Sequence, residues 1–146
     1  MHLLIWLYPL FFFTTISPGP LGNIELRLKN IEKEKGSIRL AVYDNRADFE
    51  AQGQAIYGKV ITDFSGKETS IQLPELSFGQ YAIAVYHDLN NNNKLDKTLV
   101  GIPKEPYAFS NNPKVKWNPP TFEESKFQLR EGELKMEIQL QFWSNY

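Results

Sequence analysis

The stretch GQYAIAVYHD, Gly79–Asp88, decides the fold because apolar side chains fill both of its faces. Side chains alternate between the two faces of an extended strand. One face therefore carries Tyr81, Ile83 and Val85, and the other carries Ala82, Ala84 and Tyr86. A strand that is covered on both faces lies inside a sheet, so we expect a central strand here.

Apolar residues recur at every second position through much of the remaining chain, which indicates strands rather than helices. Besides the central strand, strands are expected at 24–28, 38–42, 56–61, in a short run that ends at Leu73, at 127–129 and at 134–142. The last two are expected to pair as a hairpin around the turn Glu131-Gly132. The helical signal is about one turn long, near Arg46–Ala51.

About seven strands separated by turn signals predict an all-β fold: an antiparallel β-sandwich of the immunoglobulin or transthyretin type. A small closed barrel is the alternative. The connection from Tyr86 to Ser125 is far longer than the usual loop of a compact domain. Because five of the nine prolines fall within it, we expect a stiff, ordered loop rather than a floppy linker.

The first residues predict export. Leu3–Phe13 is apolar throughout but too short to cross a bilayer as a helix, which is typical of a secretory signal peptide over residues 1–20. A buried N-terminal strand is the alternative. Residues 21–146 then form a single domain with no transmembrane span, expected to be periplasmic, secreted or on the cell surface.

Charge and cysteine content exclude several functions. The formal net charge is −1, and basic residues are scattered among acidic ones, so we expect no nucleic-acid partner. The chain has no cysteine, which excludes disulfides and a thiolate nucleophile. After removal of the leader one histidine, His87, remains, so a zinc site built from several histidines is excluded.

Oxygen-bearing groups follow the central strand at alternate positions, which is the spacing of calcium-binding loops. The expected ligands are Asp88, Asn90, Asn92, Lys94 and Asp96, with Lys94 contributing its backbone carbonyl. Calcium takes six to eight oxygen ligands in a flexible geometry. The loop therefore predicts calcium as a cofactor, although an asparagine-rich turn whose amides cap their own backbone has the same composition.

Two positions depart from the usual calcium loop. Asn93 stands where glycine normally takes a positive φ, and Leu99 stands where a bidentate glutamate is usual. The expected substitute for that glutamate is Glu105, further along the loop, or a water molecule. With few carboxylates, we expect a dissociation constant on the order of 0.1–1 mM, as in extracellular modules.

Other groups of the long loop predict a further surface site, or the packing of the loop onto the sheet. The residues of this possible site are His87, Glu105, Tyr107, Phe109 and Ser110. The aromatic residues Tyr107, Phe109, Trp117 and Phe122 are expected either to pack the loop down or to form a platform for a sugar or peptide. Carboxylates at Glu123 and Glu124, with those of the loop, are an alternative acid–base pair.

The order of these motifs resembles a bacterial family called domain of unknown function 2141. The resemblance is carried by GSIRLAVYD, FGQYAIAVYHDLNNNNKLD, GIPKEPYAFSNN and PPTFEESKFQL, and covers about Gly36–Leu140. Asn93 and Ala108 replace two glycines of the family pattern. The matching positions are His87, Asp88, Asn90, Asn92, Asp96, Gly101, Pro103, Glu105, Phe109, Ser110, Pro120 and Phe122. The resemblance implies an exported β-sandwich, and it neither supplies nor excludes an activity.

These observations predict a non-enzymatic exported domain, in which a calcium-stabilised loop serves a binding or structural role in the cell envelope. The expected partner is a carbohydrate, a peptide or an envelope protein. The alternative is a hydrolase that uses His87 and carboxylates of the same loop.

Overall fold

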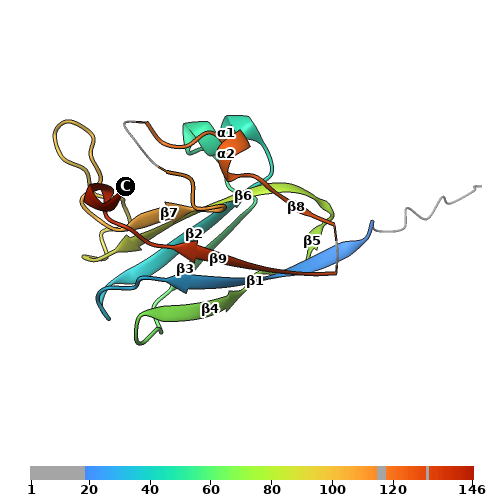
Figure 1. Ribbon diagram of the computed structural model, residues 1–146, viewed down its shortest axis with the longest axis horizontal. Coiled ribbons are helices and arrows are strands. Elements are labelled where there is room, and N and C mark those ends of the chain that lie inside the picture. The colour runs from blue at the N-terminus through green and yellow to red at the C-terminus, as the bar shows by residue number, and fades with distance from the viewer. Residues whose placement is uncertain (1–18, 115–117, 131) are drawn as a thin grey trace, which may run out of the picture.

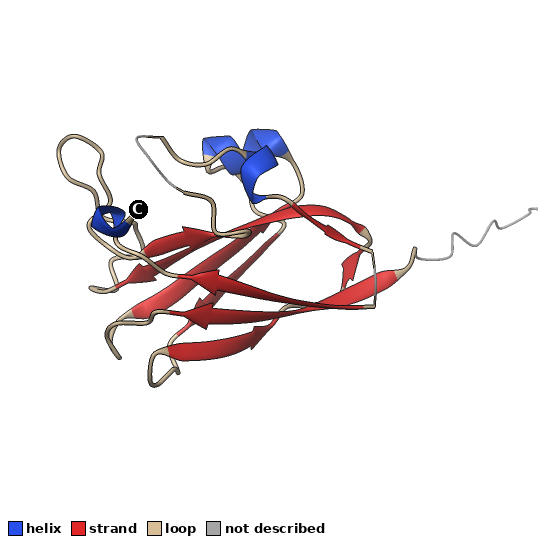
Figure 2. Cartoon of the chain, viewed as in Figure 1, coloured by secondary structure: helices blue, strands red, loops and turns tan. Residues whose placement is uncertain are grey.

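The computed structural model describes residues 19–114, 118–130 and 132–146, which fold into a β-sandwich of two sheets with short helices on one side (Figures 1 and 2). The predicted fold class is therefore confirmed. The strands are β1 Leu21–Lys29, β2 Ser37–Tyr43, β3 Tyr57–Ile61, β4 Glu68–Gln72, β5 Leu76–Ser77, β6 Gly79–Asp88, β7 Tyr107–Phe109, β8 Phe127–Leu129 and β9 Glu133–Gln139. The helices are α1 Arg46–Ala51, α2 Phe122–Ser125 and the 3-10 turn η1 Trp143–Asn145.

The first sheet is built around β1. β4 pairs antiparallel with one edge of β1, and β9 runs parallel to it on the other, from Asn23 opposite Glu133 to Lys29 opposite Gln139. β5 adds a short antiparallel pair at the start of β1. The sheet is thus antiparallel except for the β1–β9 pair.

The second sheet has the strand order β3-β2-β6, and β7 and β8 share the far edge of β6. β6 lies inside this sheet, as the apolar residues on both of its faces predict. The register places Ala41 opposite Ala84 and Arg39 opposite Tyr86. These two pairs face away from the other sheet and form part of the candidate site described below.

The predicted hairpin between 127–129 and 134–142 is wrong. β8 pairs with β6 in the second sheet, whereas β9 pairs with β1 in the first. Alternation of apolar residues specifies which face of a strand is buried but not which strand lies beside it. The chain instead passes from one sheet to the other between Leu129 and Glu133, and both strands still bury their apolar faces in the same core.

The space between the sheets is filled by fully or nearly fully buried aliphatic residues contributed by both of them. Its members include Ile24, Leu26, Leu28, Ile38, Leu40, Val42, Ile83, Val85, Leu129, Ile138 and Leu140. A second cluster lies on the outer face of the second sheet, where Phe49 of α1 and Phe122 of α2 pack over Tyr43 and Ala82. The helices therefore cover one part of that face.

Local hydrogen bonds explain both helices. Asn45 caps α1 by accepting a hydrogen bond from the Asp48 N–H, and this helix occupies the predicted range. α2 was not predicted, although Thr121 and Glu124 form a capping box in which each side chain accepts a bond from the other residue's backbone. The spacing Thr-x-x-Glu is a signal that would have revealed it.

Most of the predicted leader, residues 1–18, lies outside the described residues, so the signal peptide stays a prediction. Within the described part of the chain, no helix is long and apolar enough to span a bilayer.

Gly36 lies directly before β2 and packs against the end of β6, so its substitution tests this close contact. Its φ is +78°, and an added Cβ would lie 2.1 Å from the Asp88 carbonyl oxygen. Gly36→Ala should therefore lower the free energy of unfolding by more than about 3 kcal/mol, measured by urea denaturation. Gly66 is a matched control because its φ is +74° but nothing lies within 4 Å, and Gly66→Ala should cost about 1 kcal/mol. Equal losses would contradict the proposed clash.

Candidate functional site

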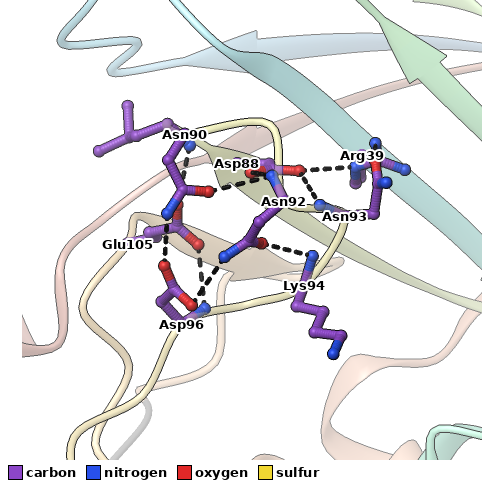
Figure 3. A network of polar contacts seen from close by, with 9 residues as sticks. Arg39, Asp88, Asn90, Asn92, Asn93, Lys94, Asp96 and Glu105 are labelled. Atoms are coloured by element: carbon purple, nitrogen blue, oxygen red, sulfur yellow. Dashed lines mark hydrogen bonds and ion pairs between the residues drawn. The ribbon is translucent and has the colours of Figure 1, made fainter.

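The asparagine loop, residues 88–96, begins at a buried carboxylate. Asp88 ends β6 with 0% of its surface exposed. Its Oδ1 accepts a hydrogen bond from the Asn92 N–H at 3.1 Å, and its Oδ2 accepts from the Asn93 N–H at 2.8 Å and from Arg39 Nε at 3.0 Å (Figure 3). The chain turns back after β6 and supplies backbone donors to this charge.

The four consecutive asparagines, 90–93, form two pairs with different structural roles. Asn91 and Asn93 have φ values of +58° and +68°, the left-handed region that asparagine tolerates better than most residues. Asn93 thus adopts the backbone conformation expected of it. Asn90 and Asn92 instead donate their side-chain amides to the Asp96 carboxylate, at 2.7 and 2.9 Å. One pair permits the turns, and the other closes the loop.

Glu105 ties the loop to the chain that follows it. Its Oε1 accepts from the Leu89 N–H at 2.8 Å and its Oε2 from the Asp96 N–H at 3.0 Å, and only 4% of its surface is exposed. It therefore lies beside the loop, where a substitute for the missing glutamate was expected. The side chain of Lys94 points out of the network, while its N–H donates to Asn92 Oδ1 (Figure 3).

Hydrogen bonding determines the charge state of Asp88. Burial raises the pKa of Asp88, but the Asn93 N–H, the Arg39 guanidinium and the Asn92 N–H together outweigh it and hold the pKa below its ordinary value. Arg39 also donates from Nη2 to Asn93 Oδ1. The carboxylate is consequently ionised at neutral pH and fixed by donors from two parts of the chain.

The predicted ligand residues converge rather than spread into solvent, but their present contacts are hydrogen bonds. The amide nitrogens of Asn90 and Asn92 face Asp96, and their oxygens accept from the N–H groups of Asn92 and Lys94. No group of three or more acidic, histidine or cysteine side chains among the described residues is arranged to hold a metal. The donor types suit calcium, whereas the two amide groups would have to turn their oxygens inward.

The five residues expected to form a further surface site do not share a surface. His87 is fully buried, its Nε2 lies 2.7 Å from the Lys35 carbonyl oxygen, and its ring packs edge-on against Phe64. Since a carbonyl only accepts, Nε2 is the donor. His87 thus anchors the chain before β2 and is not open to a substrate.

Ser110 is also structural. It is fully buried, accepts from the Ile83 N–H at 2.9 Å and donates to the Ser125 carbonyl at 2.5 Å. Asn111 and Asn112 follow it with φ values of +65° and +47°. The Asn112 side chain bonds the Glu137 carbonyl and the Gln139 N–H of β9, at 2.9 and 2.8 Å, so this segment fastens the end of β7 to both sheets.

The aromatic residues of the long loop pack against the outer face of the second sheet. Phe49 makes edge-on contacts with Phe109 and Phe122, and Tyr107 makes one with Phe109. Burial raises the pKa of Tyr107 to about 12. Trp117, the fourth aromatic residue of the expected set, lies outside the described residues. Packing of the loop is therefore observed, and Phe109 remains half-buried.

A groove of about 650 Å³ lies beside these aromatic residues on the outer face of the second sheet. Its floor contains the small pair Ala41 and Ala84, and β2 and β6 contribute larger side chains around it. One wall is the asparagine loop and the chain after it, and the opposite wall is α1 with the segment before α2. The lining includes Arg39, Ala41, Tyr43, Phe49, Glu50, Gln52, Ala84, Tyr86, Asn93, Lys94, Leu95, Lys97, Tyr107, Phe109, Pro119, Pro120 and Thr121.

A second hollow of about 220 Å³ continues the groove toward Trp143. The residues that line both are Gln52, Leu95, Lys97, Tyr107, Phe109 and Pro119. The sequence indicated Tyr107 and Phe109 as possible site residues, but it did not place Arg39, Tyr86 or the predicted helix α1 beside them. Arg39 and Tyr86 lie opposite each other on neighbouring strands. Which residues lie beside Arg39 and Tyr86 depends on strand pairing, which the sequence does not show. Alternation does place each of the two on the strand face that points away from the core.

The paired carboxylates of α2 have separate structural partners. Glu123 Oε1 lies 3.0 Å from Arg46 Nη2 and its Oε2 lies 2.6 Å from Lys126 Nζ. Glu124 belongs to the capping box. Both carboxylates are thus engaged in structural contacts.

Comparisons with known proteins match the chain to one bacterial family. The profile of the family described as "Uncharacterized protein conserved in bacteria (DUF2141)" matches residues 26–137. A search of curated proteins found no match. Among solved structures, a fimbrial assembly protein from Parabacteroides distasonis ATCC 8503 is similar, with 13% identity and a TM-score of 0.40. The match covers 83% of this chain and 53% of that one, so the chain spans about half of its length.

The lowered pKa of Asp88 predicts how stability depends on pH. A carboxylate with a depressed pKa stabilises the fold fully above its unfolded pKa, near 3.9, and loses this contribution as the pH falls toward the folded value. Asp88→Asn should cost about 1.5–3 kcal/mol at neutral pH, because the hydrogen bonds to a charged acceptor are lost. In urea denaturation the difference between the two proteins should shrink at about pH 3. A difference independent of pH would contradict this role.

Proposed function

The chain belongs to the bacterial DUF2141 family, and we propose that it is a non-enzymatic binding module of the cell envelope. The groove on the outer face of the second sheet is the binding site, and the asparagine loop is its rigid wall. One observation carries this proposal: the loop that the buried Asp88 organises also contributes Asn93 and Lys94 to the groove.

The shape and chemistry of the groove suit a small ligand. Its volume of about 650 Å³ falls in the usual range for ligand sites, roughly 300–1,000 Å³. Half-buried Tyr86 and Phe109 supply aromatic surface, and Gln52 and Thr121 supply hydrogen-bonding groups. Aromatic surface beside a few polar groups is the arrangement that binds sugar rings or short peptide segments.

The geometry does not favour the hydrolase that the sequence left as an alternative. His87 is fully buried, on the face of β6 that points between the sheets, whereas Asp88 lies on the opposite face. Glu105 is occupied by two backbone donors. A hydrolase would need another base, so the binding role is the better-supported proposal.

We further propose that calcium stabilises the asparagine loop. The Asp96 carboxylate and amide oxygens from Asn90 and Asn92 would hold the ion, with the Lys94 carbonyl as expected from the spacing. Asp88 and Glu105 would reach it through oxygens that already accept backbone hydrogen bonds. The convergence of these side chains around one turn supports this part of the proposal. Bound calcium would replace the two amide contacts to Asp96.

Filling the groove tests the binding role. Ala84→Phe places a large ring on the groove floor while retaining a residue that favours strands, so the melting temperature should change little. We expect the natural protein to bind members of an array of bacterial envelope saccharides and peptides, and Ala84→Phe to lose that binding by about tenfold or more. Leu21→Phe is the control, because Leu21 is 44% exposed on β1 of the other sheet and does not line the groove. Binding that survives in Ala84→Phe would place the site elsewhere.

Thermal melts with calcium or with a chelator test the ion. At a calcium concentration of about ten times the dissociation constant, binding should add about 1.4 kcal/mol to stability and raise Tm by roughly 5 °C. Asp96→Asn should abolish most of this shift. Asp63→Asn, which alters an exposed aspartate outside the loop, should retain it. If calcium leaves the natural protein's Tm unchanged, the loop is held by hydrogen bonds alone.

A further inference from the structure

The hairpin that follows the asparagine loop presents two apolar side chains at its tip. Leu99 and Val100, here called the tip, are 108% and 80% exposed. The other exposed large apolar residues of the described chain reach 50% at most. A single exposed apolar residue is ordinary on a protein surface, but two adjacent ones with almost no protein contact are unusual.

This tip is held in place by an ordered turn. Thr98 N–H donates to the Ile102 carbonyl at 2.7 Å, Gly101 N–H to the Thr98 carbonyl at 2.9 Å, and Ile102 N–H to Thr98 Oγ1 at 3.0 Å. Gly101 has a φ of +86°. At the base, Lys104 N–H donates to the Asp96 carbonyl at 2.8 Å. The apolar side chains are therefore presented by fixed backbone, so docking them costs little conformational entropy.

The surface around the tip is cationic. Lys94, Lys97 and Lys104 are exposed, and none forms an ion pair with a carboxylate in the described ranges. The nearby carboxylates, Asp96 and Glu105, are turned into the loop network. The hairpin thus exposes positive charge around an apolar point while its negative charges are occupied within the loop.

We propose that the tip and its three lysines dock the protein on the surface of a bilayer that contains anionic lipids. Figure 1 shows the connection between β6 and β7 projecting beyond the sheets, so the tip can enter the boundary between headgroups and acyl chains without burying the sandwich. Lysine ammonium groups bind lipid phosphates without a fixed geometry. This role goes beyond ligand binding in the groove, although Lys94 and Lys97 also line the groove, and it does not need calcium.

A bilayer fits these features better than a pocket on a partner protein. The tip carries no polar side chain that would select one orientation, and Val100 is 80% exposed even though it lines the second hollow. The lysines flank the tip in the chain, with Lys94 and Lys97 before it and Lys104 after it. Charge spread around an apolar point complements a layer of headgroups, whereas a protein pocket would need complementary groups at defined positions.

Vesicle co-sedimentation at low ionic strength tests this proposal, with a chelator present so that calcium cannot bridge protein and lipid. We expect residues 21–146 to bind phosphatidylcholine vesicles that contain phosphatidylglycerol and to bind pure phosphatidylcholine vesicles much more weakly. The double variant Leu99→Ser/Val100→Ser should bind about tenfold or more weakly. Lys97→Gln/Lys104→Gln should lose about fivefold per lysine.

Unchanged melting temperatures would show that these exposed substitutions leave the fold intact. The control, Ile56→Ser/Val60→Ser, removes apolar residues that are 45% and 50% exposed elsewhere and should bind like the natural protein. Absence of binding to the anionic vesicles, or equal binding by the tip variant, would overturn the proposal. If the anionic vesicles are not bound, a partner protein would be the remaining explanation for the exposed tip.

Discussion

The buried carboxylate of Asp88 is the constraint on which the functional part of this molecule depends. An aspartate with no exposed surface, at the end of a central strand, costs several kcal/mol unless it is paired and hydrogen-bonded. The chain meets this requirement with the Arg39 guanidinium from the neighbouring strand and with N–H groups of Asn92 and Asn93. Those two N–H groups reach Asp88 only if the chain reverses immediately after β6, and this reversal creates the loop.

The groove follows from the same arrangement together with the size of two side chains. β2 and β6 place Ala41 and Ala84 opposite each other on the outer face of the second sheet. Their small side chains leave open space above the sheet at that point. The reversed loop stands on one side of this open space, and the aromatic contacts of Phe49 with Phe109 and Phe122 hold the other side. A hollow between two supported walls is retained because neither wall can relax into it without losing its own contacts.

Sequence analysis predicted what depends on alternation and local spacing. It identified the central strand, the buried faces, α1 and the positive φ of Asn93, because each is set by residues close in the chain. It did not identify the partners of β8 and β9, because the alternation of apolar residues does not indicate which neighbouring strand a strand pairs with. For the same reason the pairing of Arg39 with Asp88, 49 residues apart, was not visible. The burial of His87 in the core excludes the surface site that was expected of it, because burial depends on how the two sheets pack.

The use of asparagine rather than aspartate at positions 90 and 92 has a further electrostatic consequence. Asp88, Asp96 and Glu105 already bring three carboxylates to one loop, and Arg39 is the one cation bonded directly within the drawn network (Figure 3). Two more aspartates would leave a surplus of negative charge that only a bound cation could offset. Amides remove that surplus, because their N–H₂ groups donate to Asp96 while their oxygens stay available to the backbone. The loop can therefore close without an ion, and a bound calcium would add to its stability without being required for its shape.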